Sequence, residues 1–411
     1  MLNRETTLLV SAEFIKWVSI GYFIIVLPIY LYELGVSPTK IGALLTLSGL
    51  VNVVILVFAG KLADTYGRKK FLVVGMFLPI LAHIIFFLTT NLNYLILAYI
   101  IGGVTIIGGI SEAFAYPSWL SMLSDTANEK NRQKIISLGM VSWSLAISVG
   151  SLLTFLPHRL ETHFGLSFLE SHRVMFLVLT LCPISAFILC LFTKEQINPN
   201  VQKLSKANFF KSSNSPLRVL SSLSPEDKPK VIKLISVMLF LGISFMIYQL
   251  SPLWFNIKFS ITEIEIGPWF SLARIGAVIG ILFSPIIVKK LNYVKSVSFA
   301  WIFGSFFIFF MMLPSSYESA ATMFIGYSIA LNLSFPIIQT FILSIFPKNL
   351  KTTASALTLA SWGISSSLSP ILGGYLIQNG HLDLPFIIAA FCYGFGGIVF
   401  FFFFRKIKIN N

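Results

Sequence analysis

Long runs of apolar residues constrain the fold of this chain more than any other feature of its sequence. A helix that crosses a lipid bilayer needs about 20 mostly apolar residues. Twelve segments meet this requirement: residues 8–32, 40–60, 70–90, 93–124, 134–156, 173–193, 231–255, 265–288, 295–314, 319–345, 353–378 and 384–404. The sequence therefore predicts an all-α, multi-pass membrane protein with twelve transmembrane helices.

The composition excludes several other classes of protein. Of the 411 residues, 56% are hydrophobic and 11% are charged, whereas a soluble domain carries about 25% charged residues. A soluble enzyme, a disordered protein and a nucleic-acid-binding module are therefore excluded as descriptions of the whole chain. The three cysteines lie within apolar segments and have no metal-binding spacing.

The net charge of +14 is explained by membrane topology. If both termini are cytoplasmic, the inner connecting segments hold 24 Lys and Arg residues and the outer segments hold 4. Such an excess is the positive-inside pattern of membrane proteins. We therefore expect a cytoplasmic (plasma) membrane protein with both termini in the cytoplasm. Its inner cations would contact anionic membrane lipids rather than nucleic acid.

The chain divides near its middle at its longest polar stretch. Residues 194–230 are basic and rich in serine, and six predicted helices lie on either side. The sequence thus predicts an N-terminal six-helix bundle over residues 1–193, a cytoplasmic linker over 194–230 and a C-terminal six-helix bundle over 231–411.

The two halves show traces of internal repetition. Ungapped alignment of the halves pairs Gly42 with Gly267, and a second alignment pairs Trp143 with Trp362. Two related bundles in parallel orientation are typical of one class of secondary transporters. The alignments therefore favour two pseudo-repeats.

A basic loop between the second and third predicted helices carries the most specific motif. Residues 60–70 read Gly-Lys-Leu-Ala-Asp-Thr-Tyr-Gly-Arg-Lys-Lys. This loop closely resembles the conserved loop of the major facilitator superfamily of transporters, which places Gly60, Asp64, Gly67, Arg68 and Lys69 in an inner gate. The corresponding loop of the second half, residues 288–295, keeps the positive charge but lacks the aspartate and the Gly-Arg pair.

Each residue of this loop has a physical reason to be there. Gly60 would let the second helix approach a neighbour closely, and Gly67 suits a tight turn with positive φ. Asp64 would be stabilised by a helix N-terminus. The resemblance implies that Asp64 meets the start of the eleventh helix near residues 351–353, and that Arg68 joins an arginine network that locks the gate.

The resemblance implies a fold and a mode of action. Members of this family consist of two six-helix bundles, act as monomers without a cofactor, and move a small-molecule substrate by alternating access. The pattern Tyr116-Pro117-Ser118 with Asp125 and Arg132 also resembles the family. Drug/proton antiporters of the family carry a Gly-Pro-x-x-Gly-Gly element in helix five, whereas residues 146–151 lack that proline.

Ionisable side chains at membrane depth cost at least about 2.5 kcal/mol on insertion scales, so each is a candidate functional site. Glu13 and Lys16 share one helix face, where they could form a mutually neutralised pair with the lysine reaching toward the inner surface. Glu112 is a candidate proton carrier, with Glu13 in reserve. Alternatively, Glu112 forms an ion pair with Lys16 or Arg132 that only joins helices.

Arg274, in the eighth predicted helix, has three interpretations. It attracts an anionic substrate, pairs with an acidic cavity residue in one gating state, or donates hydrogen bonds to backbone carbonyls. Together with other polar and aromatic residues at membrane depth it completes a set of candidates for a substrate cavity: Lys16, Tyr22, Tyr116, Tyr248, Gln249, Arg274, Asn332 and Gln339.

We therefore expect a secondary transporter, with proton coupling through Glu112, and no enzymatic activity, bound metal or nucleotide-binding loop. His158, His163 and His172 are expected in a solvated outer loop. Three alternatives remain: a facilitator of a neutral solute, a drug/proton antiporter with a degenerate helix-five motif, and a membrane-embedded protein that does not transport.

Overall fold

The computed structural model describes residues 3–105, 108–128, 131–195, 224–347 and 350–407. In these ranges the chain forms helices and no strand. The predicted linker over residues 194–230 lies outside the described residues except at its two ends. The predicted bundle boundaries at 193 and 231 therefore stay predictions.

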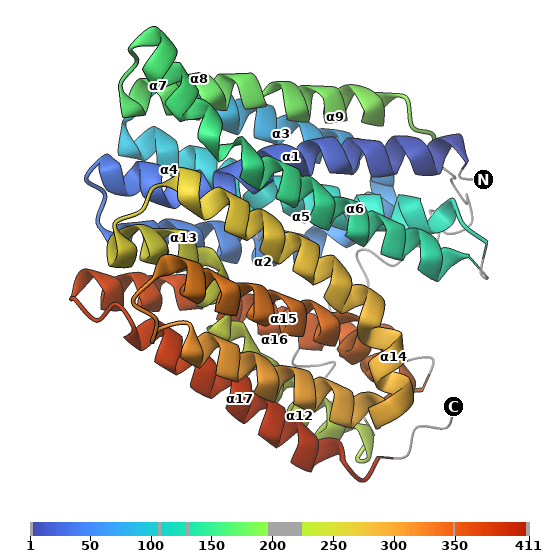
Figure 1. Ribbon diagram of the computed structural model, residues 1–411. Coiled ribbons are helices and arrows are strands. Elements are labelled where there is room, and N and C mark those ends of the chain that lie inside the picture. Colours follow the sequence, from blue (N-terminus) through green and yellow to red (C-terminus); the bar gives the residue numbers. More distant parts are fainter. Residues whose placement is uncertain (1–2, 106–107, 129–130, 196–223, 348–349, 408–411) are drawn as a thin grey trace. The chain divides into compact units, whose positions relative to one another are not determined.

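The helices follow one another along the chain in the order given by their numbers (Figure 1). The N-terminal half of the sequence contains α1 (Arg4–Glu33), α2 (Pro38–Tyr66), α3 (Arg68–Leu88), α4 (Leu92–Ile101), α5 (Gly109–Asp125), α6 (Arg132–Leu152), the short 3-10 helix η1 (Leu153–Phe155), α7 (Leu156–Phe164), α8 (Phe168–Leu179) and α9 (Leu181–Leu191). The C-terminal half contains α12 (Asp227–Ser244), α13 (Met246–Phe259), α14 (Glu263–Phe310), α15 (Tyr317–Ile345), α16 (Lys351–Gln378) and α17 (Leu384–Phe404).

Within the described ranges, nine helical stretches are long and apolar enough to cross a membrane. One of them, α14, contains two of the predicted segments. Two further predicted segments correspond to α16 and to α4 together with α5. The prediction of an all-helical, multi-pass membrane protein is confirmed, while the count of twelve remains a prediction.

The predicted continuous helix over residues 93–124 is wrong, because the chain breaks between α4 and α5. Gly102, Gly103 and Gly109 have φ values of 92°, 82° and 51°, which side chains with a Cβ rarely adopt. Polar side chains of α2 donate hydrogen bonds to backbone carbonyls on either side of the break. Ser48 Oγ donates to the carbonyl of Tyr99 at 2.9 Å, and Asn52 Nδ2 donates to that of Gly109 at 3.0 Å.

A second correction concerns the loop predicted at residues 288–295. This segment lies inside α14, whose course bends at Asn292, where φ is 65° and ψ is 170°. The Asn292 side chain accepts a hydrogen bond from the Lys295 amide at 3.1 Å. Asn292 therefore caps the second part of α14 and replaces a loop with a sharp kink.

The chain divides into two compact units. The first comprises Met1–Ser37, Ala43–Ser213 and Ile261–Ser271, and the second comprises Pro38–Gly42, Asn214–Ser260 and Leu272–Asn411. Each unit thus includes a short segment from the other half of the sequence. The start of α2 belongs to the second unit, and the start of α14 belongs to the first.

The aligned glycines Gly42 and Gly267 have the same structural role. In the second unit, a Cβ on Gly42 would collide with the carbonyl of Pro370 in α16. In the first unit, a Cβ on Gly267 would collide with Thr154 of η1. Small residues permit such close helix approach in membranes. The paired glycines therefore mark equivalent close contacts.

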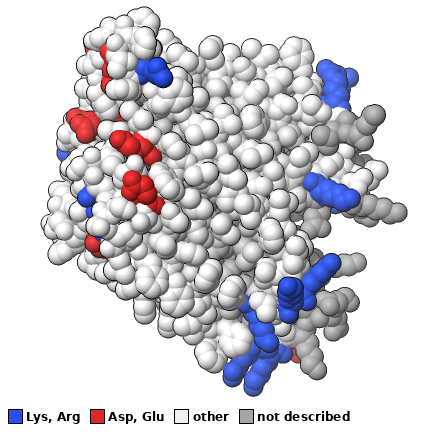
Figure 2. Space-filling view, in the orientation of Figure 1, with Lys and Arg blue, Asp and Glu red and all other residues white. Residues whose placement is uncertain are grey.

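The outer surfaces of the helices are apolar. Val54, Val57 and Phe58 of α2 are 59%, 55% and 59% exposed, which suits contact with lipid. Figure 2 shows that in each unit the charged side chains on the visible face lie near helix ends, whereas the middle of the face is free of them. This distribution follows from the cost of charge within the bilayer.

Candidate functional site

The first unit buries a cluster of three charged side chains, which we call the carboxylate–lysine cluster: Glu13, Lys16 and Glu112. Lys16 Nζ lies 2.9 Å from Glu13 Oε1 and 2.9 Å from Glu112 Oε1. The side chains of Lys16, Glu13 and Glu112 are 0%, 3% and 6% exposed. The structure thus joins α1 to α5 through one lysine.

Local helix geometry places these groups. Glu13 and Lys16 are one turn apart on α1, so their side chains share a face. Glu112 lies in the first turn of α5, because the helix restarts at Gly109 after the break. The positive end of the α5 dipole lies beside this carboxylate and stabilises its negative charge.

The two carboxylates have different hydrogen bonds. Glu13 Oε1 accepts from Lys16 Nζ at 2.9 Å and from Trp17 Nε1 at 2.6 Å. Glu112 Oε1 lies 2.9 Å from the same ammonium group, and no second donor to this oxygen is found among the described residues. Glu112 is therefore the less firmly held carboxylate of the two.

The geometry of the cluster decides where Lys16 points and which cation pairs with Glu112. Lys16 is fully buried, so a lysine that reaches toward the surface is excluded. Glu112 pairs with Lys16, whereas Arg132 is exposed. Beside the cluster, Trp17 stacks on Trp143 with ring centroids 4.6 Å apart, and the ring of Tyr116 lies 6.5 Å from that of Trp143.

Tyr22 lies two turns along α1 from Lys16. It is fully buried, and its ring lies 5.9 Å from that of Phe23 and 6.4 Å from that of Phe176. Its hydroxyl has no hydrogen-bond partner among the described residues. Tyr22 thus packs inside the first unit like an apolar residue.

The loop predicted at residues 60–70 is mostly helical, because α2 runs to Tyr66 and α3 starts at Arg68, but Gly67 forms the turn predicted for it. Gly67 has φ 106° and ends α2. Arg68 Nη1 lies 2.7 Å from Asp125 Oδ2 at the end of α5. The amides of Arg68 and Lys69 donate to the carboxylate of Glu195 at 2.8 and 3.1 Å, which caps the N-terminus of α3.

Two expectations for this loop have different outcomes. The close approach at Gly60 is not found, since a Cβ there would meet no described atom within 4 Å. The side chains of Asp64 and of residues 351–353 lie outside the described part of the chain, so their predicted contact stays a prediction. Lys69 Nζ donates to the carbonyl of Leu191 at 2.7 Å.

The second unit contains a buried arginine of a different kind. Arg274 is 7% exposed, and its guanidinium carbon lies 4.4 Å from the centre of the Tyr248 ring. No carboxylate of the described residues lies within ion-pair distance, and Nη2 has no hydrogen-bond partner among them. An arginine stacked on tyrosine is a favourable cation–π contact.

The other polar candidates of the second unit bond mainly to backbone. Gln249 Nε2 donates to the carbonyl of Ser366 at 3.3 Å, and Asn332 Nδ2 donates to that of Ser328 at 2.9 Å. Gln339 is half-buried on α15. Among these candidates, the structure therefore brings Tyr248 and Arg274 together.

A buried pair in the first unit is not among the residues predicted from the sequence. His172 Nε2 lies 3.3 Å from Glu263 Oε1, with side chains 0% and 5% exposed. The expectation of a solvated loop at His172 is wrong, because this residue lies on α8. Ser167 and Glu170 form a capping box at the start of that helix, and their spacing in the sequence is the signal that identifies such a helix.

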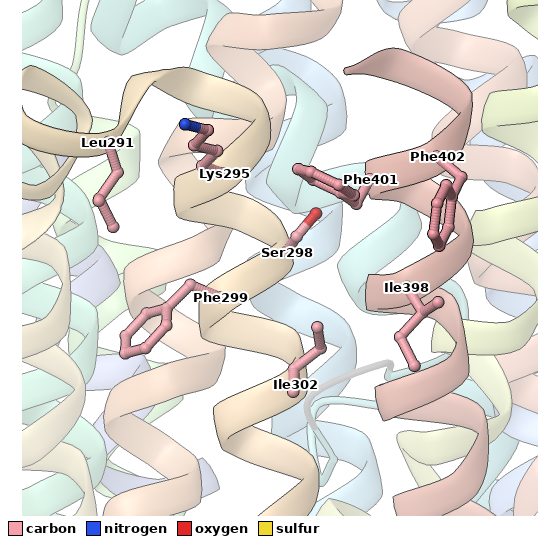
Figure 3. A pocket seen from close by; sticks show the side chains of 8 residues that line it. All are labelled: Leu291, Lys295, Ser298, Phe299, Ile302, Ile398, Phe401 and Phe402. Carbon is pink, nitrogen blue, oxygen red and sulfur yellow. The ribbon is translucent and has the colours of Figure 1, made fainter.

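A shallow groove lies apart from all these residues. It measures about 390 Å³ and lies between the second part of α14 and α17 (Figure 3). Its lining is mostly apolar, with Lys295 near one end. Among the described residues, no group of three or more His, Cys, Asp or Glu side chains is arranged to hold a metal ion.

Comparison with known proteins identifies the family. The model of the Major Facilitator Superfamily matches residues 9–370. Multidrug resistance protein 2 of Bacillus subtilis is 24% identical over 400 residues, which cover 95% of this chain and 93% of that protein. The quinolone resistance protein NorA of Staphylococcus aureus is 26% identical over 171 residues, or 40% of this chain and 42% of that protein.

Solved structures show the same fold at low sequence identity. A D-xylose–proton symporter superposes with a TM-score of 0.73 at 14% identity, covering 100% of this chain and 99% of that one. A POT family transporter in complex with 5-aminolevulinic acid gives a TM-score of 0.74 at 14% identity, covering 98% and 97%.

Proposed function

Because the chain belongs to the major facilitator superfamily, we propose that it is a secondary active transporter that moves a small organic molecule across the cytoplasmic membrane by alternating access, driven by protons. The observation that carries proton coupling is the carboxylate–lysine cluster. Two carboxylates share one ammonium group in a buried site. With all three groups ionised, the cluster has a net charge of −1, so one bound proton makes it neutral.

Glu112 is the proton-binding residue in this proposal. Glu13 is held by two donors, whereas among the described residues Glu112 contacts one donor, Lys16. A proton on Glu112 removes the charge that attracts Lys16, while Lys16 keeps its bond to Glu13. The electrostatic tie between α1 and α5 is then weakened. Such a change can bias two conformations of the transporter, because a proton shifts an equilibrium by its differential affinity.

The loop residues Gly60, Asp64, Gly67, Arg68 and Lys69 form the inner gate in this proposal. The ion pair of Arg68 with Asp125 and the cap from Glu195 support a rigid turn at this point. Arg68 and Lys69 would hold this turn in both states. Asp64 is the group that would bind and release the start of α16.

The membrane placement follows the same reasoning. We place both termini in the cytoplasm, because that orientation puts most Lys and Arg residues on the inner side. Lys295, at the groove between α14 and α17, would contact the headgroup of an anionic lipid. A monomer without a cofactor is sufficient for transport, since each candidate residue lies on this chain.

Drug export is a second candidate function. It is favoured by the likeness to multidrug resistance protein 2, which extends over 95% of this chain. The absence of the helix-five proline in residues 146–151 separates this chain from the usual drug/proton antiporter pattern. A facilitator of a neutral solute would need no buried proton-binding group, which disfavours that alternative.

Transport in everted membrane vesicles tests both candidates. The vesicles are acidified inside, and ethidium or norfloxacin is added while a fluorescent dye reports the pH gradient. We expect Glu112→Gln to lower proton-driven transport at least about tenfold, since the variant cannot exchange a proton at this position. Glu318→Gln, at an exposed carboxylate in the first turn of α15, is the matched control.

A measurement without substrate supports this assay. Infrared spectroscopy of the purified protein follows the carboxylic acid C=O band during pH titration. The wild type should show a titrating buried carboxyl that is missing in Glu112→Gln. Proton-driven transport at the wild-type rate in Glu112→Gln would exclude Glu112 as the coupling residue.

A further inference from the structure

Arg274 and Lys16 are both deeply buried, but among the described residues Arg274 has no counter-charge. Lys16 contacts two carboxylates, whereas the described residues offer Arg274 none within ion-pair distance. Arg274 is 93% buried and its Nη2 is without a hydrogen bond in the described part of the chain. A guanidinium stays charged in proteins, so the site carries a buried positive charge that no described carboxylate neutralises.

The position of this charge is set by close packing of α14 against α15. Ser328 Oγ donates to the carbonyl of Ala273 at 2.8 Å. Gly276 and Gly280 face Ile329, and a Cβ on Gly280 would lie 2.5 Å from the Ile329 carbonyl. Small residues let the two helices approach closely here. The backbone beside Arg274 is therefore firmly held.

Aromatic rings surround one side of the guanidinium. The Tyr248 ring packs against its face at 4.4 Å and is itself stacked on Phe245, 5.5 Å away. Phe324 of α15 lies 6.1 Å from Tyr248. Tyr327, next to Ser328 on α15, has a buried hydroxyl with no partner among the described residues. The site thus combines a cation, an unused hydroxyl and apolar ring faces.

We propose that Arg274 and Tyr248 recognise the carboxylate of an amphiphilic aromatic substrate. This inference rests on the proposed transport function and adds the chemical class of its substrate. The planar guanidinium is shaped for two parallel hydrogen bonds to a carboxylate. The rings of Tyr248, Phe245 and Phe324 suit the apolar body of such a molecule. An inorganic anion would use the charge but not the rings.

Equilibrium binding to the purified full chain in nanodiscs tests the proposal. The probes are 2-naphthoate and its uncharged counterpart 2-naphthamide, with benzoate and 1-pyrenebutyrate as smaller and larger carboxylates. We expect at least one carboxylate to bind, and 2-naphthamide to bind at least about tenfold more weakly than 2-naphthoate, because charge-assisted hydrogen bonds are lost. The absence of binding by all three carboxylates would overturn the proposal.

Variants locate the binding. Arg274→Gln should weaken carboxylate binding at least about tenfold, and Arg274→Lys should weaken it less. Arg173→Gln is the matched control, because Arg173 also lies over a phenylalanine ring but donates Nε to the carbonyl of Phe87. Tyr248→Leu provides a second variant that keeps the cation, and it should also weaken binding. Equal binding by wild type and Arg274→Gln would overturn the proposal.

Further measurements test whether another anion occupies the site and whether the result depends on the proposed proton coupling. Chloride, inorganic phosphate and phosphatidylglycerol in the nanodisc are tested for binding in the same way. If one of them binds wild type but not Arg274→Gln, and the carboxylates bind neither protein, the site binds another anion and the proposal fails. The assay has no pH gradient, so it does not depend on proton coupling. Binding of 2-naphthoate by the wild type would therefore support this inference even if the transport assay of Glu112→Gln excluded proton coupling at Glu112.

Discussion

At the scale of single residues, buried charges in this protein fall into two groups. Lys16 is balanced by Glu13 and Glu112 at 2.9 Å each, while Arg274 packs against the ring of Tyr248 with no counter-charge in the described part of the chain. Removing one partner of a buried ion pair costs more than the pair contributes, because the remaining charge stays buried. The two groups therefore respond differently to substitution.

Lys16→Met is predicted to destabilise the protein by about 3 kcal/mol or more, because two buried carboxylates lose the ammonium group that they share. Thermal unfolding in detergent measures this loss. Lys230→Met is the control: Lys230 also pairs with a carboxylate three residues away, Asp227, but is 32% exposed, so a loss of about 1 kcal/mol or less is expected. An unchanged melting temperature for Lys16→Met would contradict the prediction.

At the scale of elements, interruptions of helices position the functional groups. The break between α4 and α5 starts a new helix just before Glu112, and the turn at Gly67 brings two amides of α3 onto Glu195. The kink at Asn292 joins two predicted spans. Residues with positive φ set the direction of the next helix: three glycines at the first interruption, and a single residue at each of the other two.

Gly102→Ala is predicted to destabilise the first unit more than Gly35→Ala. Both glycines have positive φ, 92° and 79°, which costs a side-chain-bearing residue about 1–2 kcal/mol. A Cβ at Gly102 would also lie 2.5 Å from the carbonyl of Gly108, whereas one at Gly35 meets no described atom within 4 Å. Comparison of the two melting temperatures checks this prediction, and equal losses would argue against the observed geometry.

Glu195→Ala is predicted to lower stability by about 1 kcal/mol, because the first amides of α3 lose their acceptor. Glu195→Gln keeps an acceptor oxygen and should lose less. Slower amide hydrogen exchange in wild type than in Glu195→Ala at Arg68 and Lys69 would locate the effect. Identical exchange in both proteins would show that the cap contributes nothing.

At the scale of the whole molecule, each unit receives a helix start from the other half of the sequence. Ile261–Ser271 belongs to the first unit, where Ser271 Oγ lies 2.7 Å from Ser148 Oγ of α6. Pro38–Gly42 belongs to the second. Polar pairs such as His172 with Glu263 then tie the exchanged segment to α8.

Gly267→Leu is predicted to disrupt the packing of the exchanged segment, because its side chain would collide with Thr154 and Ser151. We expect a loss of stability of about 1–3 kcal/mol, typical of overpacking, together with impaired transport. Gly60→Leu is the matched control for stability, since a Cβ at Gly60 meets no described atom within 4 Å. Equal stability of Gly267→Leu and wild type would contradict the prediction.

The sequence by itself determined the class of the protein and most of its helices. Hydropathy depends only on which residues follow one another, so the apolar segments predicted an all-helical, multi-pass membrane protein. The motif at residues 60–70 indicated the family, and Gly67 indicated its turn. These features are local, because a bilayer selects apolar segments one at a time.

Only the tertiary structure decided which residues meet. Lys16 and Glu112 are far apart in the sequence, and their contact depends on which face each helix presents and on the break before α5. The burial of His172 also depends on which helix faces meet, and so does the position of Arg274 away from any described carboxylate. Side-chain pairing follows from helix packing, and the order of residues in an apolar segment does not specify it.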